Sequence, residues 1–360
     1  MANDSNLFRS REQLEVDGWC LDVNIFRRKN KKYLPLIEGK MFMPFDHRYA
    51  NVLFTDNIGR HGQPQLCPIA NRLNPNSLPI PEYWVDSKWI DEYKVTVGTD
   101  YYAAFKAITS VTNERTVIST ILPFHGIHDN APIIILSEQT RKALVCLVAN
   151  LNSFVFDYCA RQKMGTIKLM HYVFYQLPVL APSTYLQPVL WENTNHPLLN
   201  WVRLSILELI YTSWDIKPFA QDCGWSGPPF RWDEERRFML RSELDAAFFH
   251  LYLTADKHGE WIRAEKSAGA VQDESSKELS ELKRYFPTPR HAVEHVMNSF
   301  PIVKRKDENE HGCYRTKEVI LEIYDAMAEA IRTGIPYQTK LNPPPADPSC
   351  CHPPKPEECI

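Results

Sequence analysis

The sequence predicts a mixed α+β fold, in which a β-rich first part with one long helix precedes a mostly helical second part. Two observations carry this prediction. Before residue 110, short apolar stretches such as Tyr33–Ile37 and Lys94–Val97 are cut by Pro, Gly and Asn clusters, which is typical of strands and loops. Beyond residue 188, apolar residues recur at intervals of three and four, as on one face of a helix.

The first part has three further predicted elements. The apolar run Ala131–Leu136 predicts a buried strand, and Tyr172–Leu177 predicts another. Between them, the apolar residues of 138–163 are spaced by three and four, which predicts one long helix. Ser137 is its expected N-cap, and Gly165 is its expected stop.

The second part predicts four helices, over Leu198–Trp214, Asp233–Tyr252, His291–Asn298 and Thr316–Arg332. Residues 264–290 are polar and lack a regular apolar pattern, which favours a flexible linker or insertion. From residue 336 the chain holds eight prolines and little core material, so we expect disorder there. The expected segments are an α+β domain over 1–187, a helical region over 188–263, the linker over 264–290, C-terminal helices over 291–335 and a proline-rich tail over 336–360.

Composition is that of a soluble globular protein, with 44% hydrophobic and 24% charged residues among 360. No apolar run is long enough to span a membrane and no secretory signal begins the chain, so a cytoplasmic protein is expected. The nine cysteines are odd in number and irregularly spaced, which argues against a disulfide framework. Cys350, Cys351, His352 and Cys359 cluster without a rigid scaffold, so we expect no metal site.

Five stretches of the chain carry motifs of a known family. They are LIEGKMFMPFDHR (36–48), TNERTVISTILP (112–123), 149–178 with its LNSF, RQK and QLP, SELDAAFFHLY (242–252), and 299–325 with its FP, YRTK and ILE. In this order they resemble the C-terminal target-recognition region of type IIG restriction-modification and phage-defence adenine-specific DNA methyltransferases. The resemblance implies that the chain selects the DNA target for adenine methylation, with double-stranded DNA as its partner.

The catalytic motifs of that family are missing from this chain. No two of its 13 glycines are spaced as G-x-G, the kind of turn that lets a backbone approach adenosylmethionine closely. The nearest match to the polar-Pro-Pro-aromatic loop, Asn342–Pro345, ends in proline and has no ring to stack on a base. No catalytic residue is therefore assigned. The resemblance implies S-adenosylmethionine in a methyltransferase domain or subunit encoded separately, and a chain that is a specificity polypeptide or the C-terminal piece of a split or truncated gene.

Basic side chains within the matched stretches are the candidates for DNA contact, since Arg and Lys suit both phosphates and base edges. A dense cationic loop near residue 30 is added because it would release counterions on binding. The candidates are Arg27, Arg28, Lys29, Lys31, Lys32, Lys40, His47, Arg48, Arg115, Arg161, Lys163 and Lys168. Several have a structural alternative: Arg115 precedes the predicted strand Val117–Leu122 and could hold the turn into it, while Arg161 and Lys163 could complete a helix end.

Three other functions remain open. The chain could be a C-terminal remnant of such an enzyme that folds but binds little, or a protein-interaction subunit of a defence complex without DNA contact. It could also be a metal-dependent nuclease, because Asp22, Glu38 and Lys40 resemble the spacing of two magnesium-binding carboxylates and a lysine. Salt dependence of DNA affinity separates a phosphate-binding protein from a protein-only module.

Overall fold

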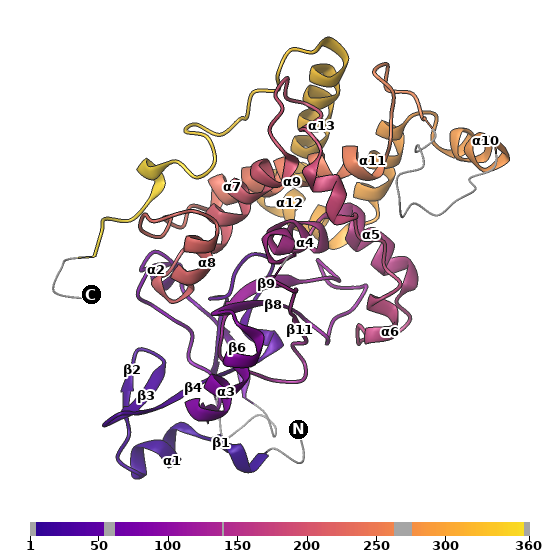
Figure 1. Ribbon diagram of the computed structural model, residues 1–360. Helices are drawn as coiled ribbons and strands as arrows, with labels where there is room; N and C mark the ends of the chain where they lie inside the picture. The colour runs from indigo at the N-terminus through magenta and orange to yellow at the C-terminus, as the bar shows by residue number, and fades with distance from the viewer. Residues whose placement is uncertain (1–4, 54–61, 139, 263–275, 356–360) are drawn as a thin grey trace.

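Strands gather in the first part of the chain and helices in the second in the computed structural model, which describes residues 5–53, 62–138, 140–262 and 276–355 (Figure 1). The last strand ends at Ile134, and every helix longer than eleven residues lies beyond it. The predicted mixed α+β class is confirmed.

The largest sheet forms one end of the molecule. Its antiparallel order is β1-β7-β4-β3-β2, and β10 pairs in parallel with β4. The strands β2, β3 and β4 form consecutive hairpins that place Phe26 opposite both Leu21 and Tyr33. Phe26 packs edge-on against Trp84 of β7 with ring centroids 5.0 Å apart, which anchors the hairpins. The bounds are β1 Phe8–Arg9, β2 Cys20–Asp22, β3 Ile25–Arg28, β4 Lys31–Ile37, β7 Trp84–Asp86 and β10 Gly126–Ile127.

A second sheet, β11-β8-β9, lies beneath the helices. All five residues of β8 and all five of β9 are buried, so both faces of this hairpin are covered. β9 confirms the predicted strand Val117–Leu122 to within two residues, whereas β11 holds only Ile133–Ile134 of the strand predicted over Ala131–Leu136. The bounds are β8 Tyr101–Phe105, β9 Ser119–Pro123, and, for the separate pair, β5 Ala50–Leu53 and β6 Gln63–Leu66.

The four helices predicted in the second part are all present, as α7 Leu198–Ile210, α9 Glu234–Tyr252, α11 Pro289–Asn298 and α13 Arg315–Thr333. Asp233 caps α9 by accepting a hydrogen bond from the Arg236 amide at 2.9 Å, and two glutamates follow in the first turn. Further helices are α1 Arg11–Val16, α2 Ile69–Arg72, α3 Ser87–Val97, α8 Lys217–Asp222, α10 Ser276–Tyr285 and α12 Pro301–His311.

The single helix predicted over 138–163 is wrong, because two helices meet there at an angle of 71°. They are α4 Leu144–Leu151 and α5 Phe154–Lys163. The Asn152 side-chain amide bonds both backbone groups of Ser119 in β9, at 2.8 and 2.9 Å, and also donates to the Val148 carbonyl of α4 at 3.0 Å. Ser153 then caps α5 through the Phe156 amide, so Ser137 caps nothing. The apolar residues keep their spacing of three and four across the break between α4 and α5, so the spacing alone does not reveal the break.

Three other local predictions are wrong. Lys94–Val97 belongs to α3, and the strand predicted over Tyr172–Leu177 is the short helix α6, His171–Phe174. Tertiary packing overrides the aromatic strand propensity there, because the Phe174 ring stacks on Phe105 at 4.2 Å. The linker expected over 264–290 contains α10 and the start of α11; its residues up to 275 lie outside the described residues.

The proline-rich tail is ordered as far as residue 355, contrary to the disorder expected over 336–360; residues 356–360 are not described. Leu341, Ala346 and Cys351 are buried in the core. One oxygen of the buried Glu243 accepts bonds from Tyr337, Thr339 and the Lys340 amide, at 2.7–2.9 Å. The carbonyls of Pro343 and Pro344 accept bonds from Arg236 at 2.7 and 2.9 Å. Hydrogen bonds to the helices hold the tail in place, although its sequence lacks a regular apolar pattern.

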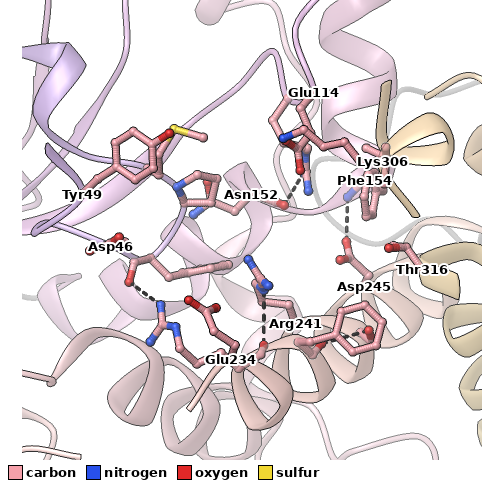
Figure 2. Close-up of a pocket in the computed structure, with 18 of the residues that line it drawn as sticks. Asp46, Tyr49, Glu114, Asn152, Phe154, Glu234, Arg241, Asp245, Lys306 and Thr316 are labelled. Atoms are coloured by element: carbon pink, nitrogen blue, oxygen red, sulfur yellow. Dashed lines mark hydrogen bonds and ion pairs between the residues drawn. The ribbon is translucent and has the colours of Figure 1, made fainter. Parts of the chain in front are cut away.

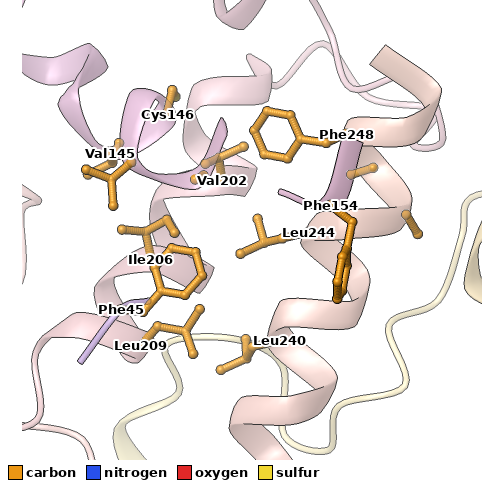
Figure 3. Packing of buried hydrophobic residues seen from close by; sticks show 14 of the residues in the cluster. Phe45, Val145, Cys146, Phe154, Val202, Ile206, Leu209, Leu240, Leu244 and Phe248 are labelled. Carbon is orange, nitrogen blue, oxygen red and sulfur yellow. The ribbon is translucent and has the colours of Figure 1, made fainter. Parts of the chain in front are cut away.

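One hydrophobic core joins both parts of the chain. It includes Phe45, the sheet residues Ala103 and Ile121, the inward faces of α4, α5, α7, α9, α11 and α13, and the tail. Figure 3 shows Phe45 entering this core between α7 and α9, beside Leu209 and Leu240. The loop that carries Phe45 is therefore fixed against the helices, which positions the site described next.

Candidate nucleic-acid interface

The matched sequence stretches converge on one cavity of about 290 Å³ beside α9 (Figure 2). Residues from all five stretches line it, although they are spread over 270 positions of sequence. They are Met43, Pro44, Phe45 and Asp46; Glu114 and Arg115; Asn152 and Phe154; Ser242 and Asp245; and Val303, Lys306 and Thr316. Tyr49, Arg72, Trp232, Glu234, Arg237, Phe238 and Arg241 complete the lining.

Arg237 fixes the floor of the cavity. Its guanidinium donates to the carbonyls of Leu209 at 2.6 Å and Phe45 at 3.0 Å, and it lies 3.7 Å from the centre of the Trp232 ring. Burial lowers the pKa of Arg237 to about 9. Because its terminal nitrogens already bond protein carbonyls, Arg237 ties α9 to the loop of Phe45 and leaves ligand contacts to its neighbours.

Arg241 and Asp245 lie one helical turn apart on α9 and face the cavity. The Asp245 Oδ1 atom accepts a bond from the Phe154 amide at 2.7 Å, which caps the start of α5. Burial raises the pKa of Asp245 to about 6, although the guanidinium of Arg115 opposes this shift. Arg241 donates through Nε to the Arg237 carbonyl at 3.2 Å, and burial lowers its pKa.

Arg48, one of the DNA-contact candidates, is buried and serves the fold. Its guanidinium donates to carbonyls of the loop after β6 and of the α7–α8 connection, at 2.8–3.4 Å: those of Asn71, Arg72, Asn74, Ser77 and Thr212. Burial lowers its pKa. A guanidinium is planar and carries five N–H donors, which allows Arg48 to bond several carbonyls at once. No terminal nitrogen of Arg48 is left to bind a phosphate.

His47 is also buried, 4% exposed, and its Nε2 atom lies 3.0 Å from Ser213 Oγ and 3.2 Å from Asp215 Oδ1. A Ser-His-Asp relay needs the serine and the carboxylate on opposite ring nitrogens, whereas here both contact the same one. Burial alone would raise the pKa of Asp215, but His47, Ser213 and Arg48 outweigh it and lower that pKa. This cluster is structural.

Arg115 and Arg161 hold the turn that precedes β9. The fully buried carboxylate of Asp157 accepts bonds from the amides of Thr116 and Val117 at 3.0 Å and from Arg115 Nε at 2.8 Å. Arg161 donates to the carbonyls of Asn113 and Glu114 at 2.9 and 3.0 Å. Arg115 therefore holds the turn, as its structural alternative states, and Arg161 bonds the same turn although its alternative was to complete a helix end. Of the two, only Arg115 also lines the cavity.

Lys40 is held by protein partners as well. Its Nζ atom donates to the Gly62 carbonyl at 2.6 Å and lies 3.1 Å from Glu38 and 3.7 Å from Glu82. Asp22 sits apart in the β2–β3 hairpin, where it pairs with Arg27 at 2.8 Å. The three residues of the nuclease alternative thus form no common site. Among the residues that the structure describes, no group of three His, Cys, Asp or Glu is placed to hold a metal.

The β3–β4 hairpin concentrates positive charge at one corner of the sheet. Arg27 lies directly opposite Lys32, and Arg28 lies directly opposite Lys31. Lys29 occupies the turn with φ of 51°, a left-handed conformation that is unusual for a lysine. Like charges directly opposite one another destabilise a strand pair. The two arginines have partners in the fold, since Arg27 pairs with Asp22 at 2.8 Å and Arg28 donates to the Asp17 carbonyl at 2.7 Å. Within the described chain Lys29, Lys31 and Lys32 form no ion pair, so the fold leaves these three charges without a partner.

A second basic surface follows α5. Residues 158–191 contain no Asp or Glu, and Lys163 and Lys168 are exposed there without an ion pair to any described residue. Tyr172 and Tyr175 stand beside them in the chain with 62% and 79% of their surface exposed. Basic side chains near exposed aromatic rings are a feature of surfaces that contact single-stranded nucleic acid.

No protein-family model, curated protein or solved structure matches the chain. Within the described residues, no single helix is long and apolar enough to cross a membrane; only the sharply bent pair Arg141–Leu151 and Phe154–Lys163 reaches that length and composition jointly.

The structure thus divides the sequence candidates into two groups. Lys40, His47, Arg48, Arg115 and Arg161 bond the protein itself, as do Arg27 through Asp22 and Arg28 through the Asp17 carbonyl. The other group is five lysines without an ion pair to a described residue: Lys29, Lys31, Lys163 and Lys168 are exposed, and Lys32 is half-buried. Sequence reasoning missed Arg241, Asp245 and Lys306, which line the cavity. A signal existed for Asp245, since it lies within the matched SELD, but its helical pattern indicated only a core helix.

Proposed function

We propose that this protein binds double-stranded DNA as the target-recognition part of an adenine-specific DNA methylation or restriction-modification system. The observation that carries the proposal is the β3–β4 hairpin, where two like-charged cross-strand pairs and Lys29 gather five cations in a six-residue segment. Phosphates facing this corner would relieve the repulsion between the strands and release counterions from the DNA.

Two further features support the proposal. The basic surface of Lys163 and Lys168 offers a second phosphate contact, with Tyr172 and Tyr175 beside it. The five stretches that resemble the methyltransferase recognition region share one cavity, as expected of motifs that act together. Methyl transfer itself would come from a separately encoded domain or subunit that holds S-adenosylmethionine, in the cytoplasm where DNA and cofactor meet.

Selection from a randomised duplex library tests sequence recognition directly. The protein is incubated with random duplexes at moderate salt, and the bound fraction is sequenced over successive rounds. Enrichment of one short motif is the expected result. A bound fraction without a common motif would reduce the protein to a non-specific DNA binder, and no bound fraction would favour the remnant or the protein-interaction subunit.

The link to methylation is tested separately. Transfer of labelled methyl groups from S-adenosylmethionine to the enriched duplex is measured with this chain alone, with the polypeptide encoded upstream alone, and with both. Transfer only by the mixture is expected. Transfer by the upstream polypeptide alone, at the same site and rate, would show that this chain does not select the target.

A further inference from the structure

The cavity beside α9 contains two charged side chains whose hydrogen-bonding atoms are only partly used by the fold. Among the described residues, the two terminal nitrogens of Arg241 have no hydrogen bond, and neither does the second carboxylate oxygen of Asp245. Both residues line the cavity, and no ion pair joins them although they are one turn apart. Figure 2 shows Asp245 bonded to Phe154 and Arg241 directed into the space above α9.

Polar atoms of a guanidinium and a carboxylate that have no hydrogen-bond partner are costly to keep in a half-enclosed site. Most other charged side chains of the lining do have partners: Arg72 pairs with Asp46 at 3.2 Å, and Lys306 pairs with Glu114. Arg115 pairs with Asp157 at 2.8 Å. The unused donors of Arg241 and the unused acceptor of Asp245 therefore lie close together, among charged side chains that are mostly paired.

A ligand that fits must present a hydrogen-bond acceptor beside a donor. The edges of nucleobases do so: adenine offers N7 beside its amino group, and cytosine and guanine offer similar pairs. The partly exposed rings of Tyr49 and Phe238, with the buried Phe154 and Trp232, supply apolar walls for a flat ligand. A volume of about 290 Å³ accommodates one ring system.

We propose that this cavity binds a single nucleobase, with Arg241 donating to an acceptor on its edge and Asp245 accepting from the adjacent amino or imino group. This inference rests on the proposed function, since DNA that the hairpin binds would supply an unstacked base. A phosphate is a poorer ligand, because its oxygens only accept and would leave the unused oxygen of the Asp245 carboxylate without a donor.

Two variants test the assignment. Asp245→Asn keeps an oxygen for the Phe154 amide but turns an amino group toward the cavity, so the acceptor becomes a donor. Arg241→Met keeps the apolar stem and removes the donors. Saturation-transfer NMR with each of the four deoxynucleosides measures binding to the wild type and to both variants. At least one nucleoside should bind the wild type, and at least tenfold more weakly to each variant.

The control is the hairpin variant Lys29→Gln/Lys31→Gln/Lys32→Gln, which should bind duplex DNA weakly and nucleosides normally. Absence of nucleoside binding to the wild type, or equal binding to all variants, would overturn the cavity assignment while leaving DNA recognition by the hairpin intact. Binding of amino acids in place of nucleosides would also overturn it, because a zwitterion satisfies the same two groups. A base site used in DNA should further raise the fluorescence of 2-aminopurine at one position of a bound duplex, and this increase should be lost in Arg241→Met.

Discussion

Replacing Asp245 with asparagine should stabilise the protein at neutral pH. The carboxylate is 6% exposed, and burial raises its pKa to about 6 from the ordinary value of 3.8. A raised folded-state pKa means that stability is fully present below pH 3.8 and is lost as the pH rises through 6. At pH 8 the charge costs about 3 kcal/mol, since each pKa unit is worth about 1.4 kcal/mol. Asparagine retains an oxygen for the Phe154 amide, so little is lost in exchange.

Urea unfolding of the wild type and of Asp245→Asn at pH 5 and pH 8 measures this difference. Linkage predicts that the variant gains about 3 kcal/mol at pH 8 and about half as much at pH 5. Asp215→Asn is the contrasting control, because His47, Ser213 and Arg48 together lower the pKa of that carboxylate despite its burial, so the loss of its charge should destabilise the protein. If Asp245→Asn is no more stable than the wild type at pH 8, or gains the same stability at pH 5 and pH 8, the claim that the buried charge of Asp245 destabilises the folded protein is refuted.

Three further predictions concern the fold. Arg48→Lys should lower the free energy of unfolding by about 3–5 kcal/mol, because an ammonium cannot reach the carbonyls that the guanidinium bonds; a change within 1 kcal/mol of the wild type would contradict that clamp. Leu341→Ala should lower the free energy of unfolding by about 2–4 kcal/mol, and the control Leu186→Ala, at an exposed leucine, should lower it much less. Equal values for the two variants in urea unfolding would mean that the tail does not pack against the core. His250 is buried against Tyr324, and burial lowers its pKa to about 4. Acidification from pH 7.5 to 5 should therefore lower the free energy of unfolding of the wild type by about 2 kcal/mol, whereas the His250→Gln variant should not show this loss. Identical pH profiles of the two proteins would count against a buried neutral histidine.

The regular helices and the fold class were predictable because apolar spacing and helix caps are local signals. α9 illustrates this, since Asp233 and the two glutamates after it mark its start. The break between α4 and α5 was not predictable from spacing, because the tertiary bonds of Asn152 to β9 cause it. The tail was missed for a similar reason: hydrogen bonds to Glu243 and Glu208 order it, and neither partner is close in sequence.

The residues of the candidate site were likewise only partly predictable from the sequence. The hairpin cations could be identified from charge density alone, because a run of basic residues is visible in a sequence. Lys163 and Lys168 were identified only because they lie in a stretch that resembles the methyltransferase family. Arg48 and Arg161 carry the same charge, yet the fold surrounds them with carbonyls that come from distant loops. Burial, which decides whether an arginine can reach DNA, depends on tertiary contacts that sequence spacing does not show.

The salt dependence of duplex binding tests the central claim most directly. Fluorescence anisotropy gives the affinity for one labelled duplex between 50 and 200 mM salt, and the slope of log K against log salt counts the phosphate contacts. The variant Lys29→Gln/Lys31→Gln/Lys32→Gln should have a slope shallower by about 3, at roughly one unit for each lysine. The charge-matched control Lys257→Gln/Lys283→Gln/Lys304→Gln, in the acidic half of the chain, should keep the wild-type slope. Equal slopes for both variants, or no binding by the wild type, would contradict DNA recognition through the β3–β4 hairpin.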